Sequence, residues 1–214
     1  SAYADWQGSG ELGILSSRGN TETDTANAKL DIANQLEQWK HGMYATALYG
    51  ADETGTPHQR WETRWQSDYR ITDPLYWFGG ARYERDKFGS FSYQESLSTG
   101  PGYKFIDSEA TRLSAQFGVG ARRSRQQTLV RNAADEVIDR IQGEEATRAM
   151  LSLGVNFEHA LTSSTKVINK LLVETASNNT FVQNDLSLHV AINNSLALSV
   201  GYGIRQNSSP PPDS

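Results

Sequence analysis

Polar and apolar residues alternate one by one along most of the chain. From position 60 to position 71, every even position carries arginine, glutamate, glutamine or aspartate, and every odd position carries tryptophan, threonine, serine, tyrosine or isoleucine. A strand places such residues on two opposite faces, whereas a helix would scatter both sets around its axis. The same alternation returns between 112 and 122, 148 and 158, 185 and 192, and 195 and 205. The pattern predicts an all-β protein with long strands.

Tight and long connectors take turns between these segments. Tight ones lie at 37–40, 72–74, 107–109, 162–164 and 193–195, and longer polar ones at 19–23, 52–58, 87–92, 124–143, 176–180 and from 207 onward. This alternation is typical of an antiparallel up-and-down transmembrane β-barrel, with short periplasmic turns and long external loops. Most strands have the roughly 9–11 residues that a tilted spanning strand needs. The predicted strands are 6–18, 24–37, 41–51, 59–71, 75–86, 92–106, 111–123, 144–159, 165–175, 181–192 and 195–206.

Eleven strands are an odd number, whereas single-chain bacterial barrels have even numbers. We therefore expect one barrel domain over residues 1–214, with 207–214 forming an external loop that leads to a twelfth strand absent from this sequence. The first residue is Ser1, without an initiator methionine. That start is typical of a mature exported protein whose signal peptide has been removed.

The apolar strand faces are predicted to meet lipid. A soluble barrel of this kind has about eight strands around one small ligand, and an apolar interior ringed by twelve would leave a large dewetted void. Aromatic residues also gather near both strand ends, as they do at the two interfaces of a membrane; the alternative interpretation is the core of an ordinary sandwich. The residues of the tight-turn girdle are Trp39, Trp77, Tyr103 and Phe105, and those of the long-loop girdle are Tyr49, Trp61, Tyr83 and Tyr93.

The opposite face is then predicted to line a narrow lumen. Charges of both signs are interspersed on it, so cross-strand ion pairs are expected. Twelve strands lie between the filled eight-strand barrel and the open porin, which disfavours a general porin and leaves a small-solute channel and a plugged barrel as alternatives. The predicted lumen residues are Lys29, Asp31, Glu62, Arg64, Asp68, Arg70, Arg82, Glu84, Lys104, Arg112, Arg122, Arg148, Glu158, Lys166, Lys170, Glu174 and Asp185.

The composition argues against several classes of function. The formal net charge of -5 gives no support to a nucleic-acid partner, and the absence of cysteine excludes disulfides, thiolate metal sites and cysteine nucleophiles. No run approaches the roughly 18 apolar residues of a membrane-spanning helix. We expect no metal and no cofactor.

Two motifs invite a catalytic or nucleotide-binding interpretation. Residues 8–13 fit the pattern G-x-G-x-x-G, but they lie inside an alternating strand rather than before a helix, as a dinucleotide site requires. Asp185, Ser187 and His189 share a strand face, yet residues two apart on a strand are expected to be too far apart for a nucleophile–base hydrogen bond. Neither motif predicts a site.

Arg123 and Arg125 are predicted to point outward where the apolar band ends, next to the longest loop. Guanidinium groups there suit the phosphates of lipopolysaccharide; the alternative is ordinary solvated charge. The loop from 126 to 145 is interpreted either as a surface-recognition element or as a solvated hairpin.

Several of these segments resemble the YdiY-like, salt-stress-induced outer-membrane proteins, a family catalogued as a domain of unknown function. The likeness covers nearly the whole chain, and its most specific pieces are Ser-Arg-Gly-Asn-Thr at 17–21 and Tyr-Glu-Arg-Asp-Lys-Phe at 83–88. The resemblance implies an outer-membrane barrel with a cleaved signal peptide, assembled by the barrel-assembly machinery. It implies no catalytic residues and no established substrate.

Three functions follow, in decreasing order of expectation. The first is a non-enzymatic outer-membrane barrel with a narrow, charge-lined lumen for small solutes or for envelope homeostasis under salt or osmotic stress. The second is a plugged structural barrel that binds lipopolysaccharide or a partner protein through its external loops. The third is a lipid-modifying enzyme of the outer membrane.

Overall fold

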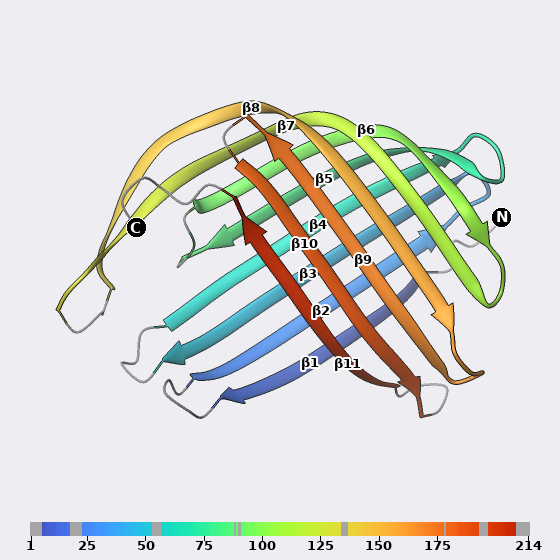
Figure 1. Cartoon of the computed structure of the whole chain (residues 1–214), viewed down its shortest axis with the longest axis horizontal. Helices are drawn as coiled ribbons and strands as arrows, with labels where there is room; N and C mark the ends of the chain where they lie inside the picture. The colour runs from blue at the N-terminus through green and yellow to red at the C-terminus, as the bar shows by residue number, and fades with distance from the viewer. Residues whose placement is uncertain are drawn as a thin grey trace.

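Eleven strands form one antiparallel sheet in which each strand pairs with the next along the chain (Figure 1). The computed structural model describes residues 6–17, 23–52, 57–87, 89, 91–133, 137–177, 179–192 and 197–208. The predicted all-β, up-and-down fold is confirmed. The strands are β1 Trp6–Ser17, β2 Thr23–Gln35, β3 Trp39–Asp52, β4 Pro57–Arg70, β5 Leu75–Asp86, β6 Phe91–Asp107, β7 Thr111–Arg131, β8 Val137–Ala160, β9 Thr165–Ala176, β10 Asn179–Ala191 and β11 Ala197–Asn207.

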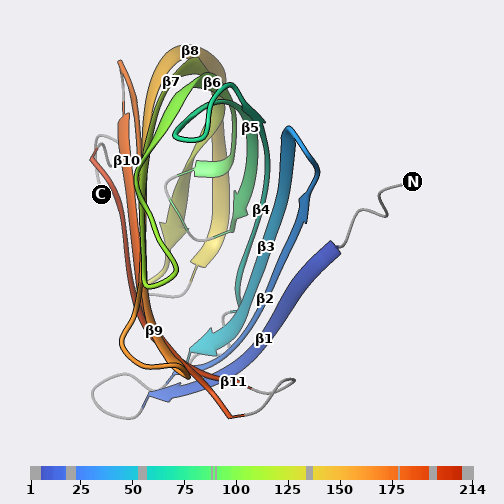
Figure 2. The same cartoon turned by 90° about the vertical axis from the view of Figure 1, so that its right-hand side faces the viewer.

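The sheet curls so that its two ends face each other. In Figure 2, β1–β5 form one wall and β9–β11 the other, and the bent strands β6–β8 join them. This curvature gives the sheet an inner face and an outer face. None of the described segments is a helix long and apolar enough to cross a membrane.

The outer face is apolar and exposed, whereas the inner face carries charges, several of which are buried. Trp65 is 45% exposed and Leu97 is 65% exposed, but Glu62 is 1% exposed and Arg82 is 5% exposed. A water-soluble protein shows the reverse distribution, with charges outside and large apolar side chains inside. The described strands therefore have the inverted polarity that a lipid environment requires.

The first and last strands of the sheet run in the same direction. Pairings in the described residues join successive strands only, and strands alternate in direction along an antiparallel meander. One more strand between β1 and β11 would be antiparallel to both of its neighbours. The twelfth strand stays a prediction.

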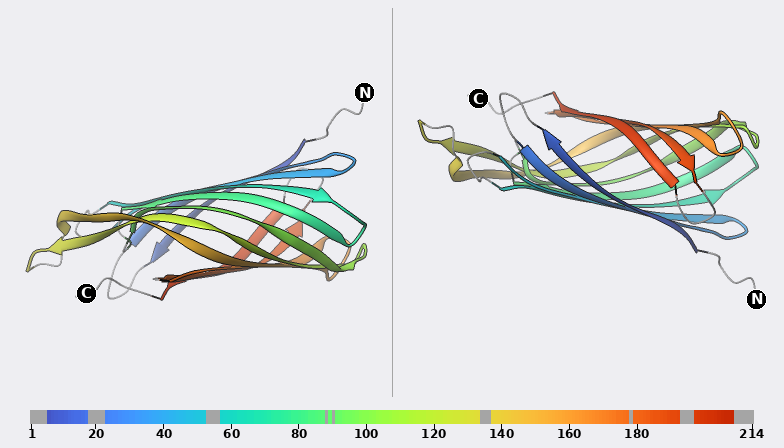
Figure 3. Two further views of the ribbon diagram at one scale, coloured as in Figure 1. Left: turned by 90° about the horizontal axis from the view of Figure 1, so that it is seen from above. Right: turned by 90° about the horizontal axis from the view of Figure 1, so that it is seen from below.

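The bounds of β7 and β8 differ from those that the sequence predicted. We expected a loop at 124–143, but Thr128 pairs with Ile141 and Val130 with Asp139 in a continuing ladder. Figure 3 shows this β7–β8 hairpin extending beyond the ends of the other strands. A ribbon outside the apolar band needs no alternation of polar and apolar residues, so the pattern failed to reveal it. The other nine strands begin and end within two residues of the predicted bounds.

Candidate functional site

Seven charged side chains from five strands meet inside the barrel, toward the end that carries the long connectors. Strand alternation turns each of them inward, and curvature brings the opposite walls within reach of each other. Five of them are almost fully buried, with exposed fractions between 1% and 5%. We call this group the ionic cluster; its members are Glu62 and Arg64 on β4, Arg82 and Glu84 on β5, Arg122 on β7, Glu174 on β9 and Arg205 on β11.

Arg82 lies at the centre of the ionic cluster. Its Nη1 donates to Glu174 Oε2 at 3.0 Å, and its Nη2 donates to Glu84 Oε2 at 2.5 Å. Its Nε lies 3.5 Å from Glu62 Oε1. The contact with Glu174 crosses the lumen, because β5 and β9 belong to opposite walls (Figure 2).

Glu174 also contacts side chains from β6 and β7. Arg122 Nη2 donates to Glu174 Oε2 at 3.1 Å and to the Glu174 carbonyl at 3.0 Å, and its Nη1 donates to the Asn179 carbonyl at 3.3 Å. The Ser96 hydroxyl donates to the other carboxylate oxygen of Glu174 at 2.9 Å. One carboxylate therefore links β6 and β7 to Arg82.

Arg205 connects β11 to β4 and β5. It donates to Glu62 Oε2 at 2.8 Å and also forms an ion pair with Glu84. Arg64 pairs with Glu62 as well, and its Nη2 donates to Gln183 Oε1 at 2.5 Å. Glu62 thus accepts contacts from three guanidinium groups, which compensate its burial.

An aromatic ring completes the cluster. Phe181 is fully buried, and its ring centre lies 4.1 Å from Arg82 Cζ and 4.6 Å from Arg205 Cζ. Such distances are typical of cation–π contacts. The ring fills space that water would otherwise occupy between two like charges.

A second group of polar side chains connects the walls nearer the tight turns. Gln66 on β4 donates to Gln116 on β7 at 3.0 Å, and Tyr76 donates to Gln116 at 3.3 Å. Lys170 on β9 donates to Asp31 on β2 at 3.2 Å. Side chains therefore bridge the lumen at more than one level.

The family model described as "Protein of unknown function, DUF481" matches residues 10–214. The chain belongs to this family. The predicted likeness to the YdiY-like proteins is confirmed, because the chain is 24% identical over 216 residues to "Uncharacterized protein YdiY" of Escherichia coli (strain K12), covering 99% of this chain and 78% of that relative. The chain is also similar to the beta domain of the Bordetella autotransporter Brka, with a TM-score of 0.46 and 14% identity over 95% of this chain and 91% of that one.

The predicted lumen residues fall into two groups in this family member. Six of them belong to the ionic cluster. Most of the others form more exposed contacts along the inner face, such as Arg112 with Glu158 at 3.4 Å and Lys166 with Glu158 at 3.5 Å. The residues outside the cluster are Lys29, Asp31, Asp68, Arg70, Lys104, Arg112, Arg148, Glu158, Lys166, Lys170 and Asp185.

Sequence reasoning left three members of this site out of the predicted set. Arg205, Phe181 and Gln183 all lie on the inward face of their strands, and alternation had placed one of them, Arg205, on that face. Phe181 was missed because an aromatic residue at a polar position looks like an exception to the pattern. Its neighbours at Gln183 and Asp185 carried the signal that it points inward.

The predicted girdle residues lie on the outer face near the strand ends. Trp39, Tyr49, Trp61, Trp77, Tyr103 and Phe105 are each at least 41% exposed, and Tyr83 and Tyr93 are partly exposed. At the long-loop end, the ring of Tyr83 stacks on Trp61 at 4.9 Å and on Tyr93 at 6.3 Å. At the tight-turn end, Trp39 contacts Tyr69 at 5.1 Å.

Arg123 and Arg125 share one carboxylate. Arg123 Nε donates to Glu145 Oε2 at 3.1 Å, and Arg125 Nη2 donates to Glu145 Oε1 at 2.5 Å. Arg123 also lies 3.7 Å from Glu95, and Arg125 lies over the ring of Tyr93 at 5.8 Å. The arginine side chains are about half and one-third exposed, so this rim is a balanced group of charges rather than a bare basic pair.

One expectation about a catalytic pair was wrong. Ser187 Oγ lies 3.0 Å from His189 Nε2, although the two residues are only two apart on β10. Both side chains lean along the strand, so the distance between their Cα atoms did not fix the distance between their ends. The Ser199 hydroxyl lies 3.5 Å from the same nitrogen, whereas Asp185 accepts a hydrogen bond from Gln183 at 2.7 Å. Asp185 therefore does not orient His189 as the third member of a triad would.

The glycine-rich motif at 8–13 lies wholly within β1. The next described element is the strand β2 and not a helix, so the described backbone offers no helix N-terminus to a phosphate. Among the described residues, no group of three histidine, aspartate or glutamate side chains is arranged to hold a metal ion.

Proposed function

We propose that this protein is a bacterial outer-membrane barrel without catalytic activity, whose lumen is closed by the ionic cluster and whose function is carried by its outer surfaces. The exposed apolar wall and the buried charges support the location. The long connectors, including the β7–β8 hairpin, would then face the exterior. The second of the three functions expected from the sequence is thus the one that the geometry supports best.

The contact between Arg82 and Glu174 carries the proposal. These side chains come from opposite walls and meet at 3.0 Å while each is almost fully buried. A continuous water-filled channel at that level would separate and hydrate them. Ion pairs that are this buried are also screened little by salt, so physiological ionic strength should leave the cluster in place.

A narrow passage for small ions, serving envelope homeostasis, is the second candidate. It is favoured by the fact that the closure consists of side chains and not of a plug of backbone. Side chains move on far shorter timescales than a folded plug. Opening would begin where the Arg82–Glu174 contact breaks, because this pair joins opposite walls.

Planar-bilayer conductance separates the two candidates. The wild-type protein should show no steady conductance, and the double variant Arg82→Ala/Glu174→Ala should show discrete openings because the crossing pair is removed without changing net charge. The matched control is Lys104→Ala/Asp107→Ala, which removes an exposed ion pair at the tight-turn end. Steady channels in the wild type would refute the closed lumen, and a silent double variant would show that Arg82 and Glu174 are not what closes it.

A further inference from the structure

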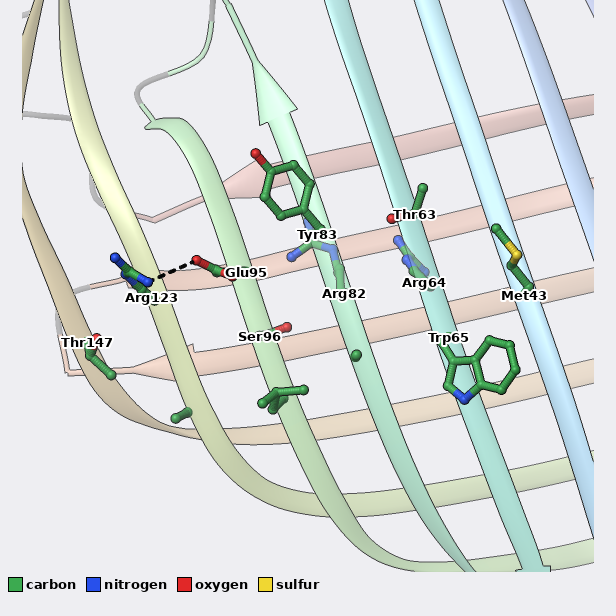
Figure 4. A pocket seen from close by; sticks show the side chains of 13 residues that line it. Met43, Thr63, Arg64, Trp65, Arg82, Tyr83, Glu95, Ser96, Arg123 and Thr147 are labelled. Carbon is green, nitrogen blue, oxygen red and sulfur yellow. Dashed lines mark ion pairs between the residues drawn. The ribbon is translucent and has the colours of Figure 1, made fainter.

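The outer wall is hollowed between β3 and β8. The hollow has a volume of about 460 Å³ and lies on the outer face, where Met43, Trp65 and Tyr83 stand around it in Figure 4. It arises from alternating residue size across the sheet, because Trp65, Ala81, Leu97 and Ala121 are successive partners in register. The two alanines leave space between larger neighbours.

Charged residues border this hollow on its long-loop side. The next row across the sheet places Tyr83 beside Glu95 and Glu95 beside Arg123. Glu95 points toward Arg123 in Figure 4, and their ion pair measures 3.7 Å. Glu145 and Arg125 continue this group away from the apolar band. We call Glu95, Arg123, Arg125 and Glu145 the rim cluster.

We propose that the hollow binds one acyl chain of a lipopolysaccharide molecule, whose phosphate and sugar hydroxyls contact the rim cluster. This inference rests on the proposed outer-membrane location, and it gives the outer surface a specific ligand. An unfilled hollow in hydrocarbon loses dispersion contacts. A flexible acyl chain recovers those contacts, whereas a rigid partner would need a matching shape.

The charge balance of the rim cluster favours a phosphorylated glycolipid over other lipids. The guanidinium groups of Arg123 and Arg125 can bind phosphate in a bidentate manner. Glu95 and Glu145 would repel a headgroup that offers phosphate alone, but they accept hydrogen bonds from hydroxyl groups. Exposed ion pairs of this kind are weak, so a headgroup can rearrange them.

Native mass spectrometry of the intact protein, purified in mild detergent from outer membranes, tests this site. Ala81→Trp fills the hollow, and Arg123→Gln removes the guanidinium group that lines the hollow and would bind the phosphate. Each variant should retain roughly tenfold less lipopolysaccharide, because Arg123→Gln loses a contact to a charged group and Ala81→Trp loses the packing of the acyl chain. Folding is followed by the heat-modifiable migration of the barrel on gels.

The matched controls change residues outside the proposed site. Val119→Trp adds the same ring at an exposed outward position outside the hollow, and Arg112→Gln removes an exposed arginine at the tight-turn end. Both controls should retain lipopolysaccharide as the wild type does. Equal losses in controls and site variants would overturn the proposal, as would stronger retention of phosphatidylethanolamine than of lipopolysaccharide in a competition between the two.

Insertion into lipopolysaccharide-free phosphatidylcholine vesicles distinguishes a failure of this inference from a failure of the proposed function. A barrel that inserts but retains no lipopolysaccharide when it is offered overturns this inference and leaves the proposed function intact. A chain that does not insert overturns the proposed membrane barrel as well.

Discussion

At the scale of single residues, Glu174 shows why the ionic cluster matters to stability. Its carboxylate contacts Arg82 and Arg122, and all three side chains are no more than 4% exposed. Removing one partner from a buried ion pair leaves an uncompensated charge in a medium of low polarity. Deleting one partner of the pair therefore destabilises the fold by more than the intact pair stabilises it.

We expect Glu174→Ala to lower the free energy of unfolding by about 3–5 kcal/mol. Urea unfolding of the barrel in lipid vesicles measures this change. Glu158→Ala is the control, because Glu158 is one-third exposed and its partners Arg112 and Lys166 are more exposed still; its effect should stay below about 1 kcal/mol. Equal effects of the two variants would contradict the cluster's role.

At position 102, the close approach of a neighbouring side chain favours glycine. A methyl group at this position would overlap the ring of Tyr76, which is 8% exposed. Gly102 therefore lets the Tyr76 ring pack closely against the backbone of β6. Gly42, on the inner face of β3, has open space beside it, because no atom beyond its own chain neighbours lies within 4 Å of the point that a methyl group there would occupy.

We expect Gly102→Ala to destabilise the barrel by about 1–3 kcal/mol through overpacking, whereas Gly42→Ala should be neutral or slightly stabilising. Thermal unfolding of both variants in the same detergent provides the comparison. Combining Gly102→Ala with Tyr76→Ala should recover part of the loss; strictly additive losses would mean that the ring and the glycine do not interact.

At the scale of elements, each strand of the β7–β8 hairpin has two consecutive segments: one lies in the barrel, and the other forms an external ribbon. Its ladder has an irregularity between Arg125 and Gln127. Gln127 then donates to the carbonyl groups of Asp86 at 3.0 Å and Gly89 at 2.8 Å. The outer ribbon begins at this anchor; its backbone pairs with itself, and Arg140 Nε donates to the Lys87 carbonyl at 3.2 Å.

Replacing residues 129–140 by Asn-Gly should leave the barrel folded, because the removed residues pair across one hairpin and Asn-Gly supplies the tight turn. Heat-modifiable migration and the urea midpoint are the measurements. Gln127→Ala serves as the comparison, because it removes the bonds to the neighbouring connector and should lower stability by about 1 kcal/mol. A deletion that prevents folding would show that the ribbon is part of the barrel's structural core.

At the scale of the whole molecule, the polarity of the barrel is inverted relative to a soluble protein. All five tryptophans, Trp6, Trp39, Trp61, Trp65 and Trp77, are between 41% and 58% exposed. They lie on the outer face, so in a bilayer they would contact lipid. Their fluorescence therefore reports directly on the proposed location.

We expect brominated acyl chains to quench the tryptophan fluorescence of the inserted barrel, and aqueous acrylamide to quench it much less. Trp65 lies near the middle of the apolar band, so bromine placed deep in the bilayer should quench it most strongly. Trp77 lies in the tight-turn girdle, so bromine placed nearer the bilayer surface should quench it most strongly. The single variants Trp65→Phe and Trp77→Phe identify each contribution. Strong quenching by acrylamide alone would mean that the outer wall faces water.

The sequence determined the local architecture of this protein because a strand repeats every two residues. Alternation identified the strands, their order and the two faces, and it placed Arg82, Glu174 and Arg205 on the same polar face. Connector length identified the two ends of the barrel. Each of these properties is encoded within a few neighbouring positions.

Only the tertiary structure decided which inward side chains meet. Arg82 and Glu174 are 92 residues apart, and their contact depends on how strongly eleven strands twist and curl before the walls approach. The same holds for Phe181 between Arg82 and Arg205, and for the hollow beside Ala81. Alternation says that a side chain points inward, but the cross-section of the barrel, which is the sum of many small strand rotations, decides whether it meets water or another side chain.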